Sequence, residues 1–352
     1  MPEVSFTSLL IVALVAVLAP LALGYAPGLR IPAVGYACTL LLGLAVGLAA
    51  RGAGWVSSAT LLAIALSATS LGLVIPVLKD AGAIDSDAGR ATIAAATVAD
   101  FAAILLLSLA FSTSGGSTGG RLVLLGAFML LVAATAGTVL AAGRSMRLGD
   151  VLTRLQDTTA EIRVRLAVLL LIGFVLLAQR FGLESILGAF LAGAVVAAVD
   201  RDASSHPNFR IKLEAIGYGF LVPVFFISSG AKLDVGGLLA EPSALLRVPV
   251  YLLALLLVRG LPALLYLPSL GRRGAVATGL LQATSLPFIV TATQIGVAIG
   301  QVSPVTAAAL VCAGLLSVLI FPAVALAALR PAGHRSTAPG TPPQPEAAPP
   351  LL

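Results

Sequence analysis

The chain has 352 residues, of which 59% are hydrophobic and 10% are charged. A typical soluble domain carries about 25% charged residues and about 45–50% apolar ones, so this composition excludes an ordinary soluble enzyme or binding domain. The net charge of +6 comes from basic loops without interleaved aromatic residues, which argues against nucleic acid as a partner. The two cysteines and two histidines lack metal-ligand spacing, and we expect no cofactor. We predict an all-α polytopic membrane protein.

Apolar runs of the length that crosses a hydrocarbon core, about 20 residues, recur along the chain. The first run lacks a basic leader and is interpreted as a retained spanning helix. A long charged linker between the fifth and sixth runs divides the chain into two halves, and the Pro- and Ala-rich tail 331–352 is predicted to be disordered and cytoplasmic. The eleven predicted spans are 4–24, 32–50, 57–79, 90–112, 121–143, 163–180, 184–200, 213–231, 245–268, 274–299 and 303–329.

Lysine and arginine are distributed unequally between alternate loops. The loops on the side of the C-terminus carry about 15, and those on the other side carry about 5. The positive-inside rule therefore predicts a multi-pass protein of the cell membrane, with its N-terminus outside and its C-terminus in the cytoplasm.

Two ionisable residues, Asp100 and Arg259, are predicted to lie deep within spans. Each costs about 2.5–3.5 kcal/mol at a helix centre on insertion scales, so such residues usually find partners or line an aqueous path. An ion or proton site is one interpretation of this pair. The other is a buried ion pair that only holds two helices together, although such a pair contributes little net stability.

Asp100 has the chemistry needed for exchange. Its ionised carboxylate is a hard oxygen ligand for Na⁺ or K⁺, and burial disfavours the charged form, so a proton can neutralise the same oxygens. Thr97 lies three residues earlier on the same helical face and can either contact the carboxylate or donate to its own helix.

A polar motif occurs twice in the apolar sequence, as "ATSLGLVIP" at 68–76 and "ATSLPFIVT" at 283–291. In both copies a hydroxyl pair, Thr69–Ser70 or Thr284–Ser285, can satisfy backbone groups of an unwound segment. Gly72, Pro76 and Pro287 weaken or break the helix nearby. A Thr/Ala-rich helix follows each copy, and with one gap Asp100 aligns with Gly314. The copies lie an odd number of spans apart, which predicts inverted repeats with two broken helices. Ordinary proline kinks are the alternative.

Several segments resemble the monovalent cation/proton antiporter family, which has a sodium/hydrogen exchanger-like fold. They are "ALSATSLGLVIPVLKDAG", "ATVADFAAILLLS", "LESILGAFLAGAVVA", "YGFLVPVFFISSGAKLD", "LLVRGLPALL" and "GLLQATSLPFIVTATQIG". They occur in order over about residues 35–329. The resemblance implies a cation/proton antiporter that is not an enzyme, with crossed broken helices and alternating access. Asp100 would bind the transported cation or proton, and Arg259 would be the basic residue before the second broken helix.

The resemblance also implies a homodimer in which a core moves against a dimerisation panel. The membrane domain would cover 1–330, with panel helices in 1–31 and about 163–231 and core helices in about 32–112 and 245–329. Two features depart from the family. Ala99–Asp100 stands where many electrogenic members have paired aspartates, which favours one-for-one electroneutral exchange. About two N-terminal spans of the family pattern are missing, which puts dimerisation and full transport in question.

Three other functions remain open at this point. The first is a potassium-efflux system of the same fold, which usually carries a cytosolic nucleotide-binding domain. The second is an intramembrane aspartyl protease, which needs two cooperating carboxylates. The third is a shortened family member that does not transport. Some further residues are weaker candidates. They are Glu184 at the start of a span, Lys212 and Glu214 on a solvated approach, glycines 188, 193 and 230 at packing contacts, and Lys232 and Asp234 in a loop.

Overall fold

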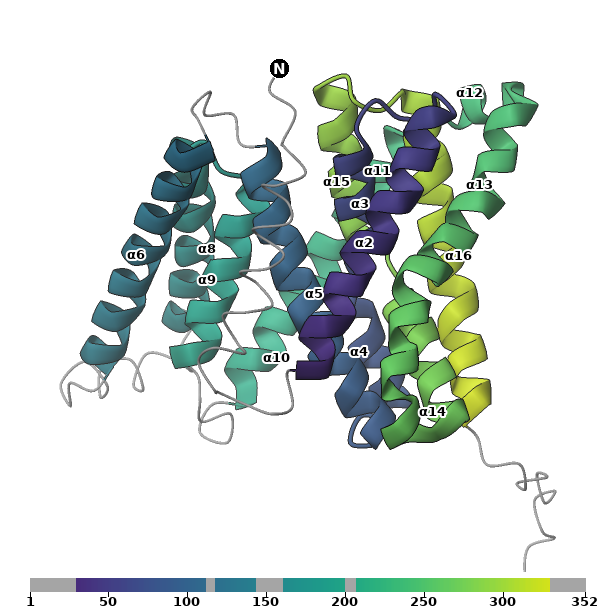
Figure 1. The fold of residues 1–352 in the computed structure, drawn as a ribbon. Coiled ribbons are helices and arrows are strands. Elements are labelled where there is room, and N and C mark those ends of the chain that lie inside the picture. Colours follow the sequence, from purple (N-terminus) through teal and green to yellow (C-terminus); the bar gives the residue numbers. More distant parts are fainter. Residues whose placement is uncertain (1–29, 112–117, 144–160, 200–206, 330–352) are drawn as a thin grey trace, which may run out of the picture.

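The computed structural model describes residues 30–111, 118–143, 161–199 and 207–329, and this part of the chain is helical (Figure 1). Its α-helices are α2 (Arg30–Gly52), α3 (Ala59–Ser67), α4 (Leu71–Asp80), α5 (Asp87–Phe111), α6 (Thr118–Gly143), α8 (Ile162–Arg180), α9 (Ser185–Val199), α10 (Pro207–Ile216), α11 (Val222–Ala231), α12 (Val235–Ala240), α13 (Pro242–Leu255), α14 (Leu267–Gln282), α15 (Pro287–Ala298) and α16 (Pro304–Leu329). Two π-helices, η2 (Gly217–Leu221) and η3 (Leu256–Gly260), and one 3₁₀-helix, η4 (Leu261–Tyr266), join neighbouring α-helices.

These helices match the predicted spans. Within the described residues, seven helical stretches are long and apolar enough to cross a membrane, and α6 and α9 contain shorter apolar stretches. One of the seven, Pro242–Ala298, reverses at Gly271 (φ 66°), where a left-handed backbone favours glycine, and so makes two passes. Each predicted span from 32–50 onward falls on described helices, and the predictions 121–143 and 184–200 fall on α6 and α9, whose apolar stretches are shorter. The span 4–24 and the tail 331–352 lie outside the described residues. The prediction of an all-α polytopic membrane protein is confirmed.

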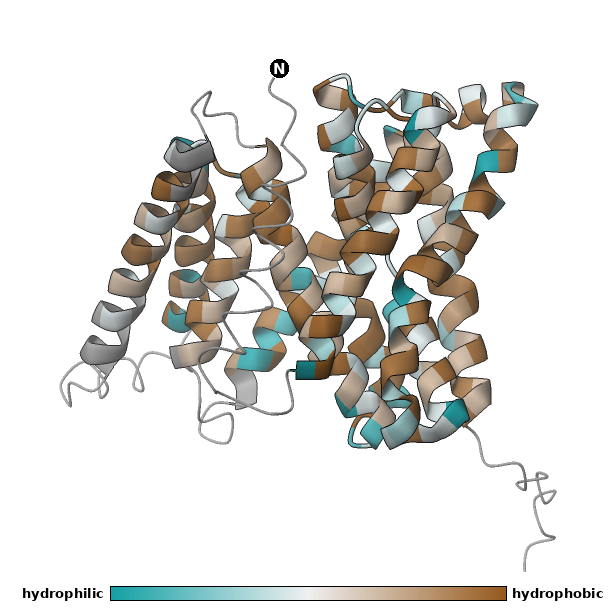
Figure 2. Cartoon of the chain, viewed as in Figure 1, coloured by the Kyte–Doolittle hydropathy of each residue, from teal (hydrophilic) through white to brown (hydrophobic). Residues whose placement is uncertain are grey.

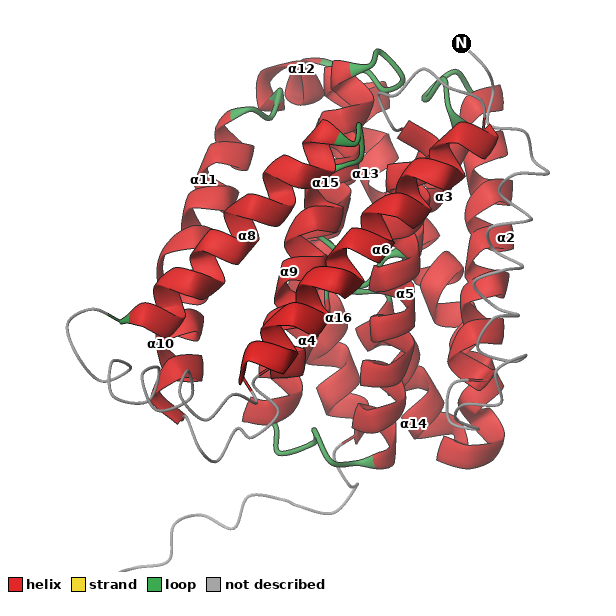
Figure 3. Ribbon diagram, turned by 90° about the vertical axis from the view of Figure 1, so that its left-hand side faces the viewer, coloured by secondary structure: helices red, strands yellow, loops and turns green. Residues whose placement is uncertain are grey.

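The helices have the apolar surfaces of an integral membrane protein. Figure 2 shows hydrophobic residues along the middle of the helices and hydrophilic ones mostly towards their ends. Figure 3 shows α8 and α6 crossing one side of the molecule. Large apolar side chains such as Leu169 on α8, Ile211 on α10 and Ile227 on α11 are exposed, at 67%, 61% and 73%. Such a surface suits contact with lipid.

The helices form two groups. In Figure 1, helices α2, α3, α4 and α13 to α16 lie together, whereas α6, α8 and α9 lie on the other side of α5. Helix α5 contacts α2, α3 and α14 in the first group and α6 and α9 in the second. The division into core helices 32–112 and 245–329 and panel helices 163–231 stays a prediction.

Two helices of the larger group are broken at the predicted positions. Helix α3 ends at Ser67 and α4 begins at Leu71, while α14 ends at Gln282 and α15 begins at Pro287. Proline at the first position of α15 has no N–H to continue a helix from α14, and it disfavours helical backbone at the preceding residue. In Figure 1, α3 and α15 lie at one end and α4 and α14 at the other, so the two broken helices run antiparallel, as inverted repeats require.

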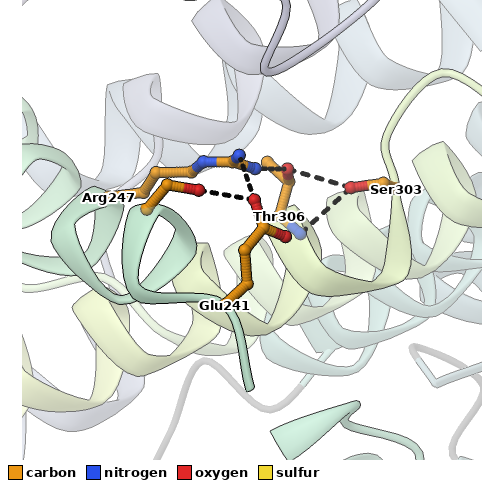
Figure 4. Close-up of polar contacts among 5 residues, drawn as sticks. Glu241, Arg247, Ser303 and Thr306 are labelled. Carbon is orange, nitrogen blue, oxygen red and sulfur yellow. Dashed lines mark hydrogen bonds and ion pairs between the residues drawn. The ribbon is translucent and has the colours of Figure 1, made fainter. Parts of the chain in front are cut away.

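The end of this group near α3 and α15 is tied together by contacts within the second repeat and by contacts between the two repeats. Figure 4 shows the Arg247 guanidinium of α13 reaching Glu241 (3.2 Å) and Thr306 of α16 (2.9 Å). The same guanidinium lies 5.6 Å from the centre of the Trp55 ring, a cation–π contact. The segments before α3 and α16 also form a short backbone bridge, Val56 with Val302.

Candidate functional site

The two unwound segments cross and satisfy one another. The Ser70 N–H donates to the Thr284 carbonyl at 2.9 Å, and the Leu286 N–H donates to the Ser70 hydroxyl at 3.0 Å. The Thr69 hydroxyl donates to the Gln282 carbonyl at 2.9 Å. All three bonds join one repeat to the other. They supply partners for backbone groups that the broken helices leave unpaired. An unpaired backbone N–H or carbonyl group is costly at membrane depth.

Asp100 on α5 caps the start of α4, the second half of the first broken helix. Its Oδ1 accepts the Thr69 N–H at 3.0 Å and its Oδ2 accepts the Leu71 N–H at 3.4 Å. A carboxylate at the start of α4 is favoured by the unpaired N–H groups and the positive end of the helix dipole. Ala96, Ala99 and Ala103 are fully buried on α5, and these small residues let it pack closely at this level. Asp100 itself is half-buried.

Arg259 is 1% exposed, and three neutral oxygen atoms surround its guanidinium. Its Nε donates to the Gln282 carbonyl (3.3 Å), its Nη1 to the Thr39 hydroxyl (3.3 Å) and its Nη2 to the Thr69 hydroxyl. Arg259 lies in the π-helix η3, and such local bulges often mark functional sites.

The direct buried ion pair that the sequence allowed is absent: among the described residues, Arg259 and Asp100 form no salt bridge. Thr69 links them instead, because its N–H binds the carboxylate while its hydroxyl oxygen accepts from the guanidinium. Thr69 therefore joins the Arg259 guanidinium to the Asp100 carboxylate without direct contact between the two charged groups.

The remaining predicted site residues make local or structural contacts. The Thr97 side chain is exposed and donates to the Ile93 carbonyl at 2.8 Å, the helix-internal arrangement that the sequence left open. Thr284 likewise donates to Leu280, at 3.2 Å. The Ser70 hydroxyl is used in the crossing. Cation ligation by Thr97 or Ser70 stays a prediction.

In the second repeat a neutral hydroxyl group, that of Ser317, takes the place that the Asp100 carboxylate has in the first. The Ser285 N–H donates to the Ser317 hydroxyl of α16 at 3.2 Å, much as the Thr69 N–H donates to Asp100. The sequence alignment placed Gly314 at this position, and the bonding residue is one helical turn further on. Gly314 has a packing role instead, because a Cβ there would lie 2.8 Å from the Ser285 carbonyl oxygen.

We expect Gly314→Ala to destabilise the second crossing. The added methyl group has to displace backbone at the break, and such overpacking costs about 1–3 kcal/mol. The measurement is the thermal unfolding midpoint of the purified protein in detergent. Gly193→Ala on α9 is the matched control, because a Cβ at Gly193 meets nothing within 4 Å. Equal midpoints for the two variants would contradict this role of Gly314.

The sequence reasoning missed three residues of the network, namely Thr39, Gln282 and Ser317. Each is at most 3% exposed. A buried polar residue usually has a hydrogen-bond partner, so their depth in predicted spans was a usable but unspecific signal.

Among the residues that the structure describes, the segment formed by η2 and α11 makes two hydrogen bonds to the broken helices. The Tyr218 hydroxyl in η2 donates to the Gly72 carbonyl at 3.4 Å. That carbonyl is free to accept because Pro76, four residues later, has no N–H. Gln294 on α15 donates to Ser229 on α11 at 3.3 Å.

The weaker candidates take ordinary positions. The Glu184 N–H donates to Ser108 on α5 at 3.2 Å, just before α9 begins. Lys212 pairs with Glu161 at 2.6 Å and Glu214 with Arg210 at 3.1 Å. Lys232 caps the end of α11, and Asp234 caps the start of α12 through the Gly237 N–H. Of the three glycines, Gly188 packs tightly against the backbone at Phe174, whereas Cβ atoms at Gly193 and Gly230 would meet nothing.

The fold and this crossing define a polytopic membrane protein with an inverted pair of broken helices and one carboxylate at their intersection. Residues 4–327 match the family described as "Sodium/hydrogen exchanger, transmembrane". The chain belongs to this sodium/hydrogen exchanger family, as the sequence motifs indicated.

Curated relatives agree with this membership. The chain is 31% identical over 273 residues to the putative Na(+)/H(+) antiporter YjbQ of Bacillus subtilis (strain 168), covering 77% of this chain and 42% of that protein. It is 30% identical over 261 residues to the glutathione-regulated potassium-efflux system protein KefC of Klebsiella pneumoniae (strain 342), covering 72% and 40%. It is 28% identical over 217 residues to an Na(+)/H(+) antiporter of Enterococcus hirae, covering 60% and 53%. The chain thus spans about half the length of these relatives.

Proposed function

We propose that the protein is a secondary active transporter that exchanges a monovalent cation, Na⁺ or K⁺, for protons across the cell membrane by alternating access. The observation that carries the proposal is the position of Asp100, a half-buried carboxylate at the crossing of two broken helices. Membership of the sodium/hydrogen exchanger family supports it, as does the word antiporter in the names of two relatives.

Competition for one carboxylate provides the coupling. The Thr69 and Leu71 N–H groups hold the ionised Asp100 in place, and its remaining lone pairs can bind a dehydrated cation. When a proton occupies the same oxygens, the cation is released. Cation and proton therefore load the site alternately, and the structure needs no second titrating group for this step.

The fixed charge of Arg259 favours the ionised carboxylate without neutralising it. Its guanidinium is held by Thr39, Thr69 and the Gln282 carbonyl, so it does not occupy the carboxylate oxygens. We infer that this separation keeps Asp100 available to the transported ion.

In the proposed orientation the C-terminus is cytoplasmic, and by analogy with the family the protein works as a homodimer.

The experiment is cation-dependent proton flux in proteoliposomes that carry a trapped pH dye. A pulse of external Na⁺ or K⁺ is expected to drive protons out of vesicles that contain the protein, whereas a choline pulse is not. Comparing the two cations shows which one the site prefers.

A potassium-efflux function is the second candidate, because one relative is a potassium-efflux protein. In that case K⁺ would leave loaded vesicles without proton movement in the opposite direction. Absence of any cation or proton flux from correctly folded protein would refute both candidates.

A further inference from the structure

Helix α2 contributes two buried polar side chains to the crossing, although no motif pointed to it. The Tyr36 hydroxyl is within 3.1 Å of the Ser67 hydroxyl, at the last residue of α3, and Thr39 accepts a hydrogen bond from Arg259. Tyr36 and Thr39 are 2% and 0% exposed. They lie three residues apart, so both side chains are on the same face of the helix.

Glycines hold α2 close to the broken helix. Gly43 lies so near α3 that a Cβ there would be 3.1 Å from the Ala63 carbonyl oxygen, and Gly47 packs still more tightly against the backbone of Ala59. The backbone of α2 is therefore fixed relative to α3, and its side chains provide fixed points for the guanidinium.

The hydroxyl of Thr39 is oriented as an acceptor for Arg259. Its proton is donated to the Gly35 carbonyl at 3.0 Å, which leaves the oxygen lone pairs towards the guanidinium. Thr69 is arranged in the same way, because its proton goes to Gln282 while its oxygen accepts from Arg259. Two threonines, one on α2 and one in the unwound segment between α3 and α4, thus hold the two Nη atoms of one arginine.

We propose that Thr39 is a positioning residue for the ion site. By fixing Nη1 it holds the guanidinium against Thr69, whose N–H in turn holds Asp100. The titratable groups that interact with Arg259 are Tyr36 on α2, Asp100 on α5 and Tyr266 on η4. Thr39 reaches the ion only through Arg259 and Thr69. The transport part of this proposal rests on the proposed function, whereas the contact with Arg259 does not.

The test replaces the hydroxyl while keeping the shape. In Thr39→Val the Arg259 Nη1 loses its acceptor, and the apparent KM for the transported cation is expected to rise about tenfold, the size expected for one lost hydrogen bond to a charged group. The maximal exchange rate is expected to change less. Thr39→Ser keeps the hydroxyl and is expected to restore a KM near that of the wild type.

Thr293→Val is the matched control, because Thr293 is a buried threonine of α15 whose hydroxyl donates only within its own helix. A KM for Thr39→Val equal to that of Thr293→Val would overturn the proposal. So would a failure of Thr39→Ser to restore the wild-type value.

A second measurement does not depend on transport. Unfolding midpoints in detergent are compared for Thr39→Val, Arg259→Gln and the double variant. We expect the two changes to be non-additive, because they remove the same hydrogen bond. Additive effects would overturn the contact itself. Coupled stabilities together with a wild type that moves no ions would instead refute the proposed function.

Discussion

Asp100→Asn is expected to reduce cation-driven proton movement to the rate of protein-free liposomes. The amide has nearly the shape of the carboxylate, and its oxygen can still accept the Thr69 N–H. It carries no charge to attract a cation and takes up no proton in the physiological range. The Leu71 N–H loses its acceptor, because the amide NH₂ can only donate, but the bond from the Thr69 N–H is kept. We therefore expect the variant to fold while the exchange chemistry is lost. The measurement is the initial rate of dye response after a Na⁺ or K⁺ pulse.

The control for this variant is Asp85→Asn, since Asp85 is an exposed residue between α4 and α5. Its exchange rate is expected to equal that of the wild type. The thermal unfolding midpoint of Asp100→Asn is measured in parallel, to separate lost chemistry from lost folding. If the folded Asp100→Asn protein exchanged ions as fast as the wild type, Asp100 would not be the shared carboxylate.

Arg259→Ala is expected to lower stability and to move the pH dependence of exchange, with little effect on the choice between Na⁺ and K⁺. Removal of the guanidinium leaves a cavity and takes one hydrogen-bond donor away from each of the buried oxygens of Thr39, Thr69 and Gln282, which we expect to cost about 2–4 kcal/mol. A positive charge nearby favours an ionised carboxylate, so without it the pH of half-maximal exchange is expected to rise.

These effects are measured as the unfolding midpoint in detergent and as exchange rate against pH in liposomes. Arg90→Ala is the control, because Arg90 forms an exposed pair with Asp87 and such pairs contribute little. An altered Na⁺/K⁺ preference with unchanged stability would show that Arg259 acts on the ion directly, contrary to its position behind Thr69.

The breaks and the carboxylate could be predicted because their signals are local. Adjacent hydroxyls with a nearby proline or glycine in an apolar run have few structural explanations, and Asp100 is too costly at that depth to be incidental. The antiparallel course of the two broken helices followed from the order of the spans alone. The positions of the breaks and of the carboxylate depend on features within a few residues of each other, whereas the antiparallel course depends only on counting the spans.

The partners of Arg259 could not be predicted, because they depend on side-chain geometry between distant segments. Thr39 has the appearance of an ordinary helical threonine, and nothing in the sequence signals that η3 widens into a π-helix. The choice between Gly314 and Ser317 depended on one alignment gap in an Ala/Leu-rich helix. A shift of one turn there leaves the hydrophobic pattern almost unchanged, so only the packing decides it.

The hydrogen bonds between the two unwound segments also constrain how the protein is made. The Thr69 hydroxyl donates to the Gln282 carbonyl, 213 residues later, and the Ser70 hydroxyl accepts the Leu286 N–H, 216 residues later. At about 5–20 residues per second, a ribosome needs roughly 10–40 s to synthesise that interval. During this time the first broken helix is in the membrane without its partner. Its unwound segment therefore reaches the crossed arrangement only late in biogenesis, once α14 and α15 have been inserted.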